Sequence, residues 1–139
     1  MRFRVRRLRQ RGAELVEFAV VLPLALIILF GIIEVAVAAF DQAILTNASR
    51  VAAREAIRGA TEAEWTQAAE QAAQFMVKWN GTEPLDVAVL PDPSTAEEGT
   101  ALTATATYPF GFFVLPRLLD AWPDITLSAS TVMRVLPHR

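Results

Sequence analysis

The sequence contains no cysteine, and it has one histidine and one tyrosine among its 139 residues. The lack of cysteine excludes disulfide bonds and thiolate metal sites. The histidine, His138, is the penultimate residue, which is a poor position for a general base. The sequence also lacks a P-loop and a G-x-G-x-x-G motif. We therefore expect a protein that is not an enzyme and that holds no cofactor and no metal ion.

Positive charge is scarce outside the first 12 residues. These contain six arginines and no acidic residue: Arg2, Arg4, Arg6, Arg7, Arg9 and Arg11. Residues 13–139 carry seven basic residues against 15 acidic ones. The body of the protein is thus acidic, and we expect no nucleic-acid partner despite the basic leader. The acidic loop that contains Asp92, Glu97 and Glu98 is better explained as solvated surface than as a calcium site.

A long apolar run follows the arginines. Residues 18–40 contain one charged residue, Glu34. A helix rises about 1.5 Å per residue, so this run extends about 35 Å and can cross the hydrocarbon core of a bilayer. The arginines lie on its N-terminal side alone. The positive-inside rule then predicts a single-pass protein with a basic cytoplasmic leader (1–12), a transmembrane helix (13–40) and an extracytoplasmic domain (41–139).

Two other interpretations of this run stay open. A cleaved secretory signal peptide is one, because Ala36-Val37-Ala38 is similar to a signal peptidase site. Against it, the apolar stretch exceeds the usual core of about 7–15 residues, and Glu34 falls just before the site. The other is an uncleaved, single-pass anchor that carries an interaction module of the cell envelope.

Three residues in or beside the span are unusual for a transmembrane helix. Glu17 lies at its start, where a carboxylate is costly. Glu34 lies near the outer interface and is expected to stay hydrated there; an intramembrane contact with a partner helix, or with a basic group of another subunit, is the alternative. Pro23 lacks an N–H and clashes with the preceding turn, so we expect it to kink or loosen the helix.

The residues around the start of the span resemble those of a known family. The run from Arg11 to Pro23, RGAELVEFAVVLP, is similar to the N-terminus of TadE-like proteins, which are minor pseudopilins of tight-adherence (Tad, type IVb) pilus systems. The strong part of the resemblance covers about residues 10–58. Residues 108–110 and 125–135 resemble the family more weakly.

The resemblance implies that a prepilin peptidase, an aspartic membrane protease, cleaves the chain between Gly12 and Ala13. Glu17 and Phe18 would then be the fifth and sixth residues of the mature chain. The new amine of Ala13, or that of a neighbouring subunit, can pair with Glu17 and offset the cost of its charge at the membrane boundary.

The resemblance also implies a cellular role. It implies a protein of the bacterial inner membrane that acts in the initiation or assembly of a Tad/Flp pilus, and so in adhesion. The implied partners are the prepilin peptidase, other pilins and pseudopilins, the inner-membrane assembly platform and membrane lipid.

The apolar spacing beyond the span predicts that the helix continues as far as Gly59. Thr61 and Glu64 form a capping-box pattern that starts a second helix, which we expect to end at Asn80-Gly81. One face of this helix carries six apolar residues that are typical of a core: Trp65, Ala68, Ala69, Ala72, Met76 and Trp79.

The remaining residues predict strands. Residues 85–90, 101–108 and 125–136 have β-type composition or alternation. The order of helices followed by strands favours an α+β fold over a parallel α/β fold, with a roughly three-stranded antiparallel sheet in a small pilin-like domain. The aromatic-rich segment 109–123 either contacts a partner or covers one end of the sheet.

Overall fold

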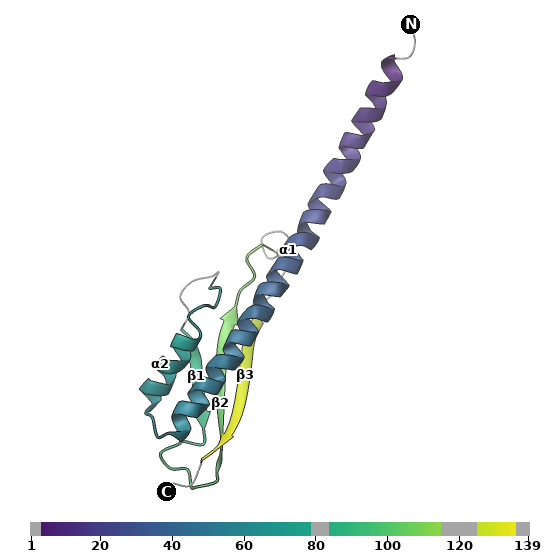
Figure 1. Ribbon diagram of the computed structural model, residues 1–139. Helices are drawn as coiled ribbons and strands as arrows, with labels where there is room; N and C mark the ends of the chain where they lie inside the picture. The colour runs from purple at the N-terminus through teal and green to yellow at the C-terminus, as the bar shows by residue number, and fades with distance from the viewer. Residues whose placement is uncertain (1–3, 79–83, 115–124, 136–139) are drawn as a thin grey trace.

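The computed structural model describes residues 4–78, 84–114 and 125–135. Along the chain these form a long helix, a short helix and three strands (Figure 1). Their bounds are α1 (Arg4–Ile57), α2 (Glu62–Ala72), β1 (Asp86–Leu90), β2 (Ala101–Phe110) and β3 (Ile125–Arg134). The α+β fold with a long N-terminal apolar helix, a second helix and a three-stranded antiparallel sheet is confirmed.

Helix α1 dominates the shape of the molecule. Its 54 residues extend about 80 Å, and its N-terminal part projects away from the rest of the chain (Figure 1). The kink predicted at Pro23 does not interrupt it, because α1 is helical on both sides of this residue. Proline removes one backbone donor, and the hydrogen bonds of the flanking turns keep the helix continuous.

The end of α1 follows the prediction. Gly59 has a φ of 85°, a left-handed conformation that glycine adopts without a steric penalty. The N–H of Ala60 donates to the carbonyl of Glu55 at 3.2 Å, and that of Gly59 donates to Ala56 at 3.1 Å. These two bonds form a Schellman motif, which satisfies carbonyls that the helix end leaves without a partner.

Helix α2 starts as predicted but ends earlier. The backbone N–H of Thr61 donates to the carboxylate of Glu64 at 2.7 Å, as a capping box requires. The predicted end at Asn80-Gly81 is wrong, because α2 ends at Ala72. The N–H of Val77, which a continuing helix would bond to Ala73, instead bonds to a side chain of α1. Trp79, Asn80 and Gly81 lie outside the described residues.

The sheet is an antiparallel meander with the order β1-β2-β3. Alternate residues of β2 are buried, as the alternation predicted, and the strand extends two residues past the predicted end, to Phe110. Val87 of β1 and Ala129 of β3 both pair with Ala106 of β2, and all three are buried. One face of the sheet is therefore the core face, on which the C-terminal part of α1 packs.

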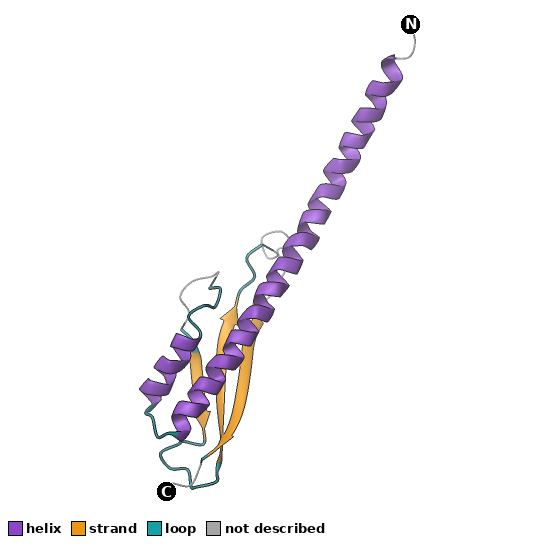
Figure 2. Cartoon of the chain, in the orientation of Figure 1, coloured by secondary structure: helices purple, strands orange, loops and turns teal. Residues whose placement is uncertain are grey.

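The core is built largely from small residues. Figure 2 shows α1 crossing the sheet, with α2 beside it. The buried residues of this part of α1 include four alanines: Ala48, Ala52, Ala53 and Ala56. They belong to the same core cluster as Ala104 and Ala106 of β2. Alanine on both sides allows the helix and the sheet to approach closely. We call residues 41–57 of α1, together with α2 and the three strands, the head.

Candidate assembly surface on the N-terminal helix

The N-terminal half of α1, residues 12–40, presents large apolar side chains outward. Leu15, Val20 and Ile32 are each more than 60% exposed. The helix between Gly12 and Ile57 contains a stretch of mean hydropathy 2.8, of which 6% is buried. It is long and apolar enough to cross a membrane. The core helix of a soluble protein would instead be mostly buried, so this half of α1 is a candidate membrane anchor.

The residues of the predicted processing site lie at the start of this half. Gly12 and Ala13 are part of the continuous helix, and a Cβ placed on Gly12 would meet nothing within 4 Å beyond its chain neighbours and the adjoining helix backbone. Glu17 and Phe18 are exposed. Glu17 is four residues after Ala13, so the two lie one turn apart on the same side of α1. Among the described residues, the structure therefore leaves this site open to another molecule.

The prediction that Glu34 stays hydrated is wrong, because the structure buries this residue. Its side chain is 3% exposed. One carboxylate oxygen, Oε1, accepts the backbone N–H of Phe113 at 2.8 Å and also that of Val114. The segment 111–114, which follows β2, is thereby fixed against α1. Two backbone donors on one carboxyl group compensate for much of the cost of burying its polar oxygen atoms.

Asp41 is a second buried carboxylate, and the sequence analysis did not identify it. It is fully buried, and its Oδ1 accepts the backbone N–H of Val77 at 2.9 Å. Its Oδ2 has no hydrogen-bond partner among the described residues. Burial raises the pKa of Asp41 above its ordinary value, and the bond from Val77 opposes that rise.

The two carboxylates lie on one face of α1. They are seven residues apart, which is close to two helical turns. They are also the only charged residues between Phe18 and Ser49. This spacing was the available signal for Asp41: two isolated acids on the same face of one helix share similar surroundings, although the spacing does not identify the donors that bind them.

Below Asp41, polar contacts join α1 to β3. The Nε2 of Gln42 donates to the carbonyl of Ser128 at 2.8 Å. The hydroxyls of Ser49 and Thr131 are 2.8 Å apart and share a hydrogen bond. These contacts, with those of Glu34 and Asp41, fix the position of the head along α1.

The Glu34 contact also shapes a surface on the N-terminal half of α1. Phe113 and Val114 form one wall of an apolar groove of about 460 Å³. The other wall is α1, through Leu22, Pro23, Leu26, Ile27 and Phe30. Pro23 thus lines this groove, while the helix that contains it stays uninterrupted. Of the aromatic segment 109–123, residues 115–123 lie outside the described residues; the described part contacts α1, and Pro109 and Phe110 belong to β2.

The described residues offer little for catalysis or metal binding. They contain no group of three or more histidine, cysteine, aspartate or glutamate side chains that could hold a metal ion. Arg50 and Arg54 of α1 are exposed, and so is Arg58, which follows the end of this helix and pairs with Glu55 at 2.7 Å. The features that stand out are therefore the apolar half of α1 and the two buried carboxylates.

Comparison with known proteins identifies the N-terminal segment. Residues 12–54 match a family model described as TadE-like protein. The resemblance seen in the sequence is thus confirmed over that segment, which contains Gly12, Ala13, Glu17, Glu34 and Asp41. The family connects the chain with Tad pilus systems. Neither the curated proteins nor the solved structures include a significant match to the chain.

Proposed function

We propose that this protein is a minor pseudopilin of a Tad/Flp type IVb pilus system and acts in pilus initiation or assembly, and so in adhesion. The observation that carries the proposal is the TadE-like match over residues 12–54. It coincides with a continuous helix whose first half is apolar and exposed and whose second half forms the core of a small α+β head. The protein acts by binding other subunits and not by catalysis.

The proposed topology places α1 across the bacterial inner membrane. Residues 1–12 form the cytoplasmic leader, residues 13–40 span the bilayer, and residues 41–139 lie outside the cytoplasm. The six leader arginines support this orientation. The exposed apolar side chains of the N-terminal half of α1 contact lipid or the equivalent helices of other pilins and pseudopilins in the assembly platform.

A prepilin peptidase removes the leader between Gly12 and Ala13 in this proposal. Cleavage makes Ala13 the first residue of α1. Glu17 then lies in the first turn, where a carboxylate is favourable because the helix dipole and the unpaired N–H groups are positive there. The amine of Ala13, or that of a neighbouring subunit, pairs with Glu17. Phe18 follows it as the first large apolar side chain of the mature span.

The structure argues against a direct contact between Glu34 and a partner helix. Its carboxylate is occupied by the N–H groups of Phe113 and Val114. We therefore assign it an indirect part in intramembrane contacts. It holds Phe113 and Val114 against α1, and these two residues present an apolar wall to a neighbouring subunit.

Mass spectrometry of the protein purified from membranes tests the processing step. A mature N-terminus at Ala13 is expected in cells that contain the peptidase, and an intact chain is expected in cells that lack it. A chain that keeps Met1 in both would support the uncleaved interaction module. A chain that begins at Ala39 would support a secretory signal peptide.

Two matched variants test the assembly step. Glu17→Ala should leave cleavage intact but abolish or strongly reduce pili, because the charge pair with the new amine is lost. Glu14→Ala, which removes a nearby carboxylate of the same helix, is the control and should assemble pili normally. Pili of normal number and length in the Glu17→Ala strain would remove the assembly role of this residue.

A further inference from the structure

Strand β1 is an edge of the sheet. It pairs with β2 alone, so its other side has no strand partner among residues 4–78, 84–114 and 125–135. The outward N–H and C=O groups of an edge strand are a template for another strand. Pro84 precedes β1 and Pro91 follows it. Because proline lacks an N–H, the two prolines confine any added strand to the five residues between Asp86 and Leu90.

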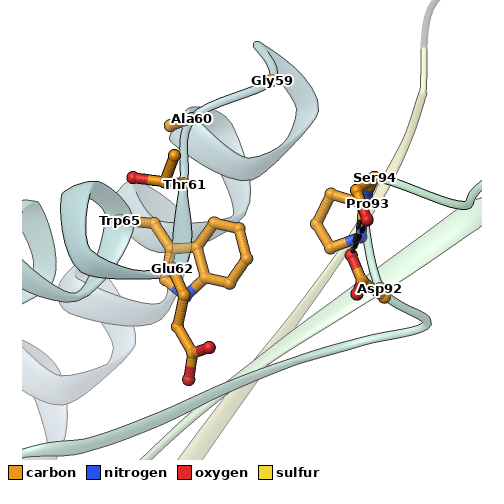
Figure 3. A pocket seen from close by; sticks show the side chains of 8 residues that line it. All are labelled: Gly59, Ala60, Thr61, Glu62, Trp65, Asp92, Pro93 and Ser94. Carbon is orange, nitrogen blue, oxygen red and sulfur yellow. Dashed lines mark hydrogen bonds between the residues drawn. The ribbon is translucent and has the colours of Figure 1, made fainter.

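A groove follows this edge. A hollow of about 350 Å³ is lined by every residue of β1 and, across from the strand, by Glu62 and Trp65 of α2. A second hollow, of about 300 Å³, continues past the end of β1 between the start of α2 and residues 92–94. Figure 3 shows Trp65 and Glu62 on one side of this second hollow and Asp92, Pro93 and Ser94 on the other. The groove is therefore open to an extended chain longer than β1 itself.

The groove is acidic. Exposed carboxylates line it at Glu62, Asp86 and Asp92, and none of its lining residues is basic. Asp86 and Asp92 are six residues apart, which is about 20 Å along an extended chain. Hydrogen bonds from the hydroxyl and backbone N–H of Ser94 lower the pKa of Asp92, so this carboxylate stays ionised. Negative charge is thus present at both ends of the edge.

The wall of the groove also contains an unsatisfied donor. The Nε1 of Trp65 is buried and has no acceptor among the described residues. A buried N–H without a partner is unfavourable, and a small movement of the ring toward the groove would allow a carbonyl oxygen to bind it. A polypeptide backbone in the groove would bring such oxygens along the whole edge.

We propose that the groove beside β1 binds an extended, basic segment of a partner protein, which adds to the sheet as a fourth strand. Backbone hydrogen bonds to β1 supply affinity, and the carboxylates of Glu62, Asp86 and Asp92 select lysine and arginine side chains. This role is independent of leader cleavage and of the pilus function proposed above. It makes the head a binding site for one segment of another envelope protein.

A binding measurement on the full chain tests this proposal. The protein is placed in nanodiscs of phosphatidylcholine, a lipid with no net charge. Fluorescence anisotropy then follows a labelled five-residue peptide of alternating lysine and valine, which matches the length of β1. We expect saturable binding. A peptide of alternating glutamate and valine should not bind. A lysine–valine peptide with alternate backbone amides methylated keeps its charge but loses strand donors, and it should bind much more weakly.

Charge variants locate the binding site. The double variant Glu62→Lys/Asp86→Lys should weaken binding of the lysine–valine peptide by about tenfold, because two attractions become repulsions. The matched double variant Glu70→Lys/Glu97→Lys changes the net charge equally at exposed positions outside the groove and should bind within about twofold of the original protein. Glu62→Lys alone provides a milder variant if the double variant does not fold.

The outcomes are distinct. Equal loss in both double variants, or equal binding of the methylated peptide, would mean general attraction of cations and would overturn strand addition. Absence of binding by the lysine–valine peptide would overturn the proposal directly. None of these results depends on whether Ala13 is the mature N-terminus, so the pilus function is tested separately.

Discussion

The two halves of α1 belong to one uninterrupted helix, yet they face different surroundings. In the N-terminal half, large side chains such as Leu15 and Val20 are exposed. In the C-terminal half, the buried face consists mainly of alanine, with Leu45 as its largest fully buried apolar side chain. The two halves also differ in hydropathy, because residues 18–40 contain one charged residue whereas residues 41–57 contain four: Asp41, Arg50, Arg54 and Glu55. The size of the apolar side chains fits this division, because small residues permit close packing on a sheet whereas large ones cover the surface of a span.

The exposed half of α1 gives way to the packed half in the stretch between Glu34 and Asp41, the two buried carboxylates. Glu34 binds backbone donors of the segment after β2, and Asp41 binds the segment after α2. The head is thus attached to α1 at two levels by acids that accept N–H groups from other parts of the chain. At these two positions of the helix, a charged residue type marks an attachment point and not contact with water, whereas Glu17, Arg50 and Arg54 of the same helix are exposed.

The largest expected effect tests whether the two halves differ in packing. Leu45→Ala removes a fully buried side chain and should lower the free energy of unfolding of the head by about 2–5 kcal/mol. Ile28→Ala, in the exposed half, should change it by less than about 0.5 kcal/mol. Tryptophan fluorescence during urea unfolding in detergent micelles measures both. Similar losses in the two variants would show that the halves are packed alike.

A smaller effect on stability is expected at Glu34, which holds the segment after β2 against α1. Glu34→Ala leaves the N–H groups of Phe113 and Val114 without their acceptor and should cost about 1–3 kcal/mol locally. Hydrogen exchange at these two amides should accelerate, while exchange in β2 stays slow. Glu17→Ala, at an exposed acid of the same helix, is the control. Unchanged exchange at both amides would contradict the contact.

The smallest effect is expected at Asp41, and its sign depends on pH. Burial raises the pKa of Asp41 in the folded protein above its ordinary value of 3.8. The folded state therefore binds the proton of this carboxyl group more tightly than the unfolded state does. The stabilisation from the protonated form is complete below pH 3.8 and is lost as the pH rises through the folded pKa. Ionised Asp41 thus destabilises the head near neutral pH.

Asp41→Asn should therefore be at least as stable as the original protein at pH 7, since the amide oxygen can still accept the N–H of Val77. The advantage should vanish below pH 4. Urea unfolding of both proteins across this pH range measures the difference. A variant that is less stable at pH 7 would show that the ionised carboxylate is favourable in the fold.

Much of the fold could be predicted from local patterns. Gly59 identified the end of α1, Thr61 and Glu64 identified the start of α2, and alternation identified β2 and its buried face. These features depend on neighbours within a few residues. The end of α2 could not be predicted in this way, because the N–H of Val77 bonds to Asp41, which is 36 residues away.

The candidate site divides in the same manner. The motif from Gly12 to Phe18 and the apolar span were evident from the sequence, and the match to TadE-like proteins covers them. The burial of Glu34 was not evident, and its expected hydration was wrong. Its donors are on residues 79 and 80 positions later in the chain, and no local pattern relates an acid in a helix to the backbone of a loop after a strand.

The sequence by itself determined that the protein has a basic N-terminal segment, an apolar helix with a TadE-like start, and a head with α+β periodicity, because composition and spacing encode local structure and hydrophobicity. Only the tertiary structure decided which parts of the chain satisfy Glu34 and Asp41 and which edge of the sheet lies open beside an acidic groove. These outcomes require distant segments to meet, and hydrogen bonds are short-ranged, so a difference of a few ångströms decides whether a carboxylate is solvated or held.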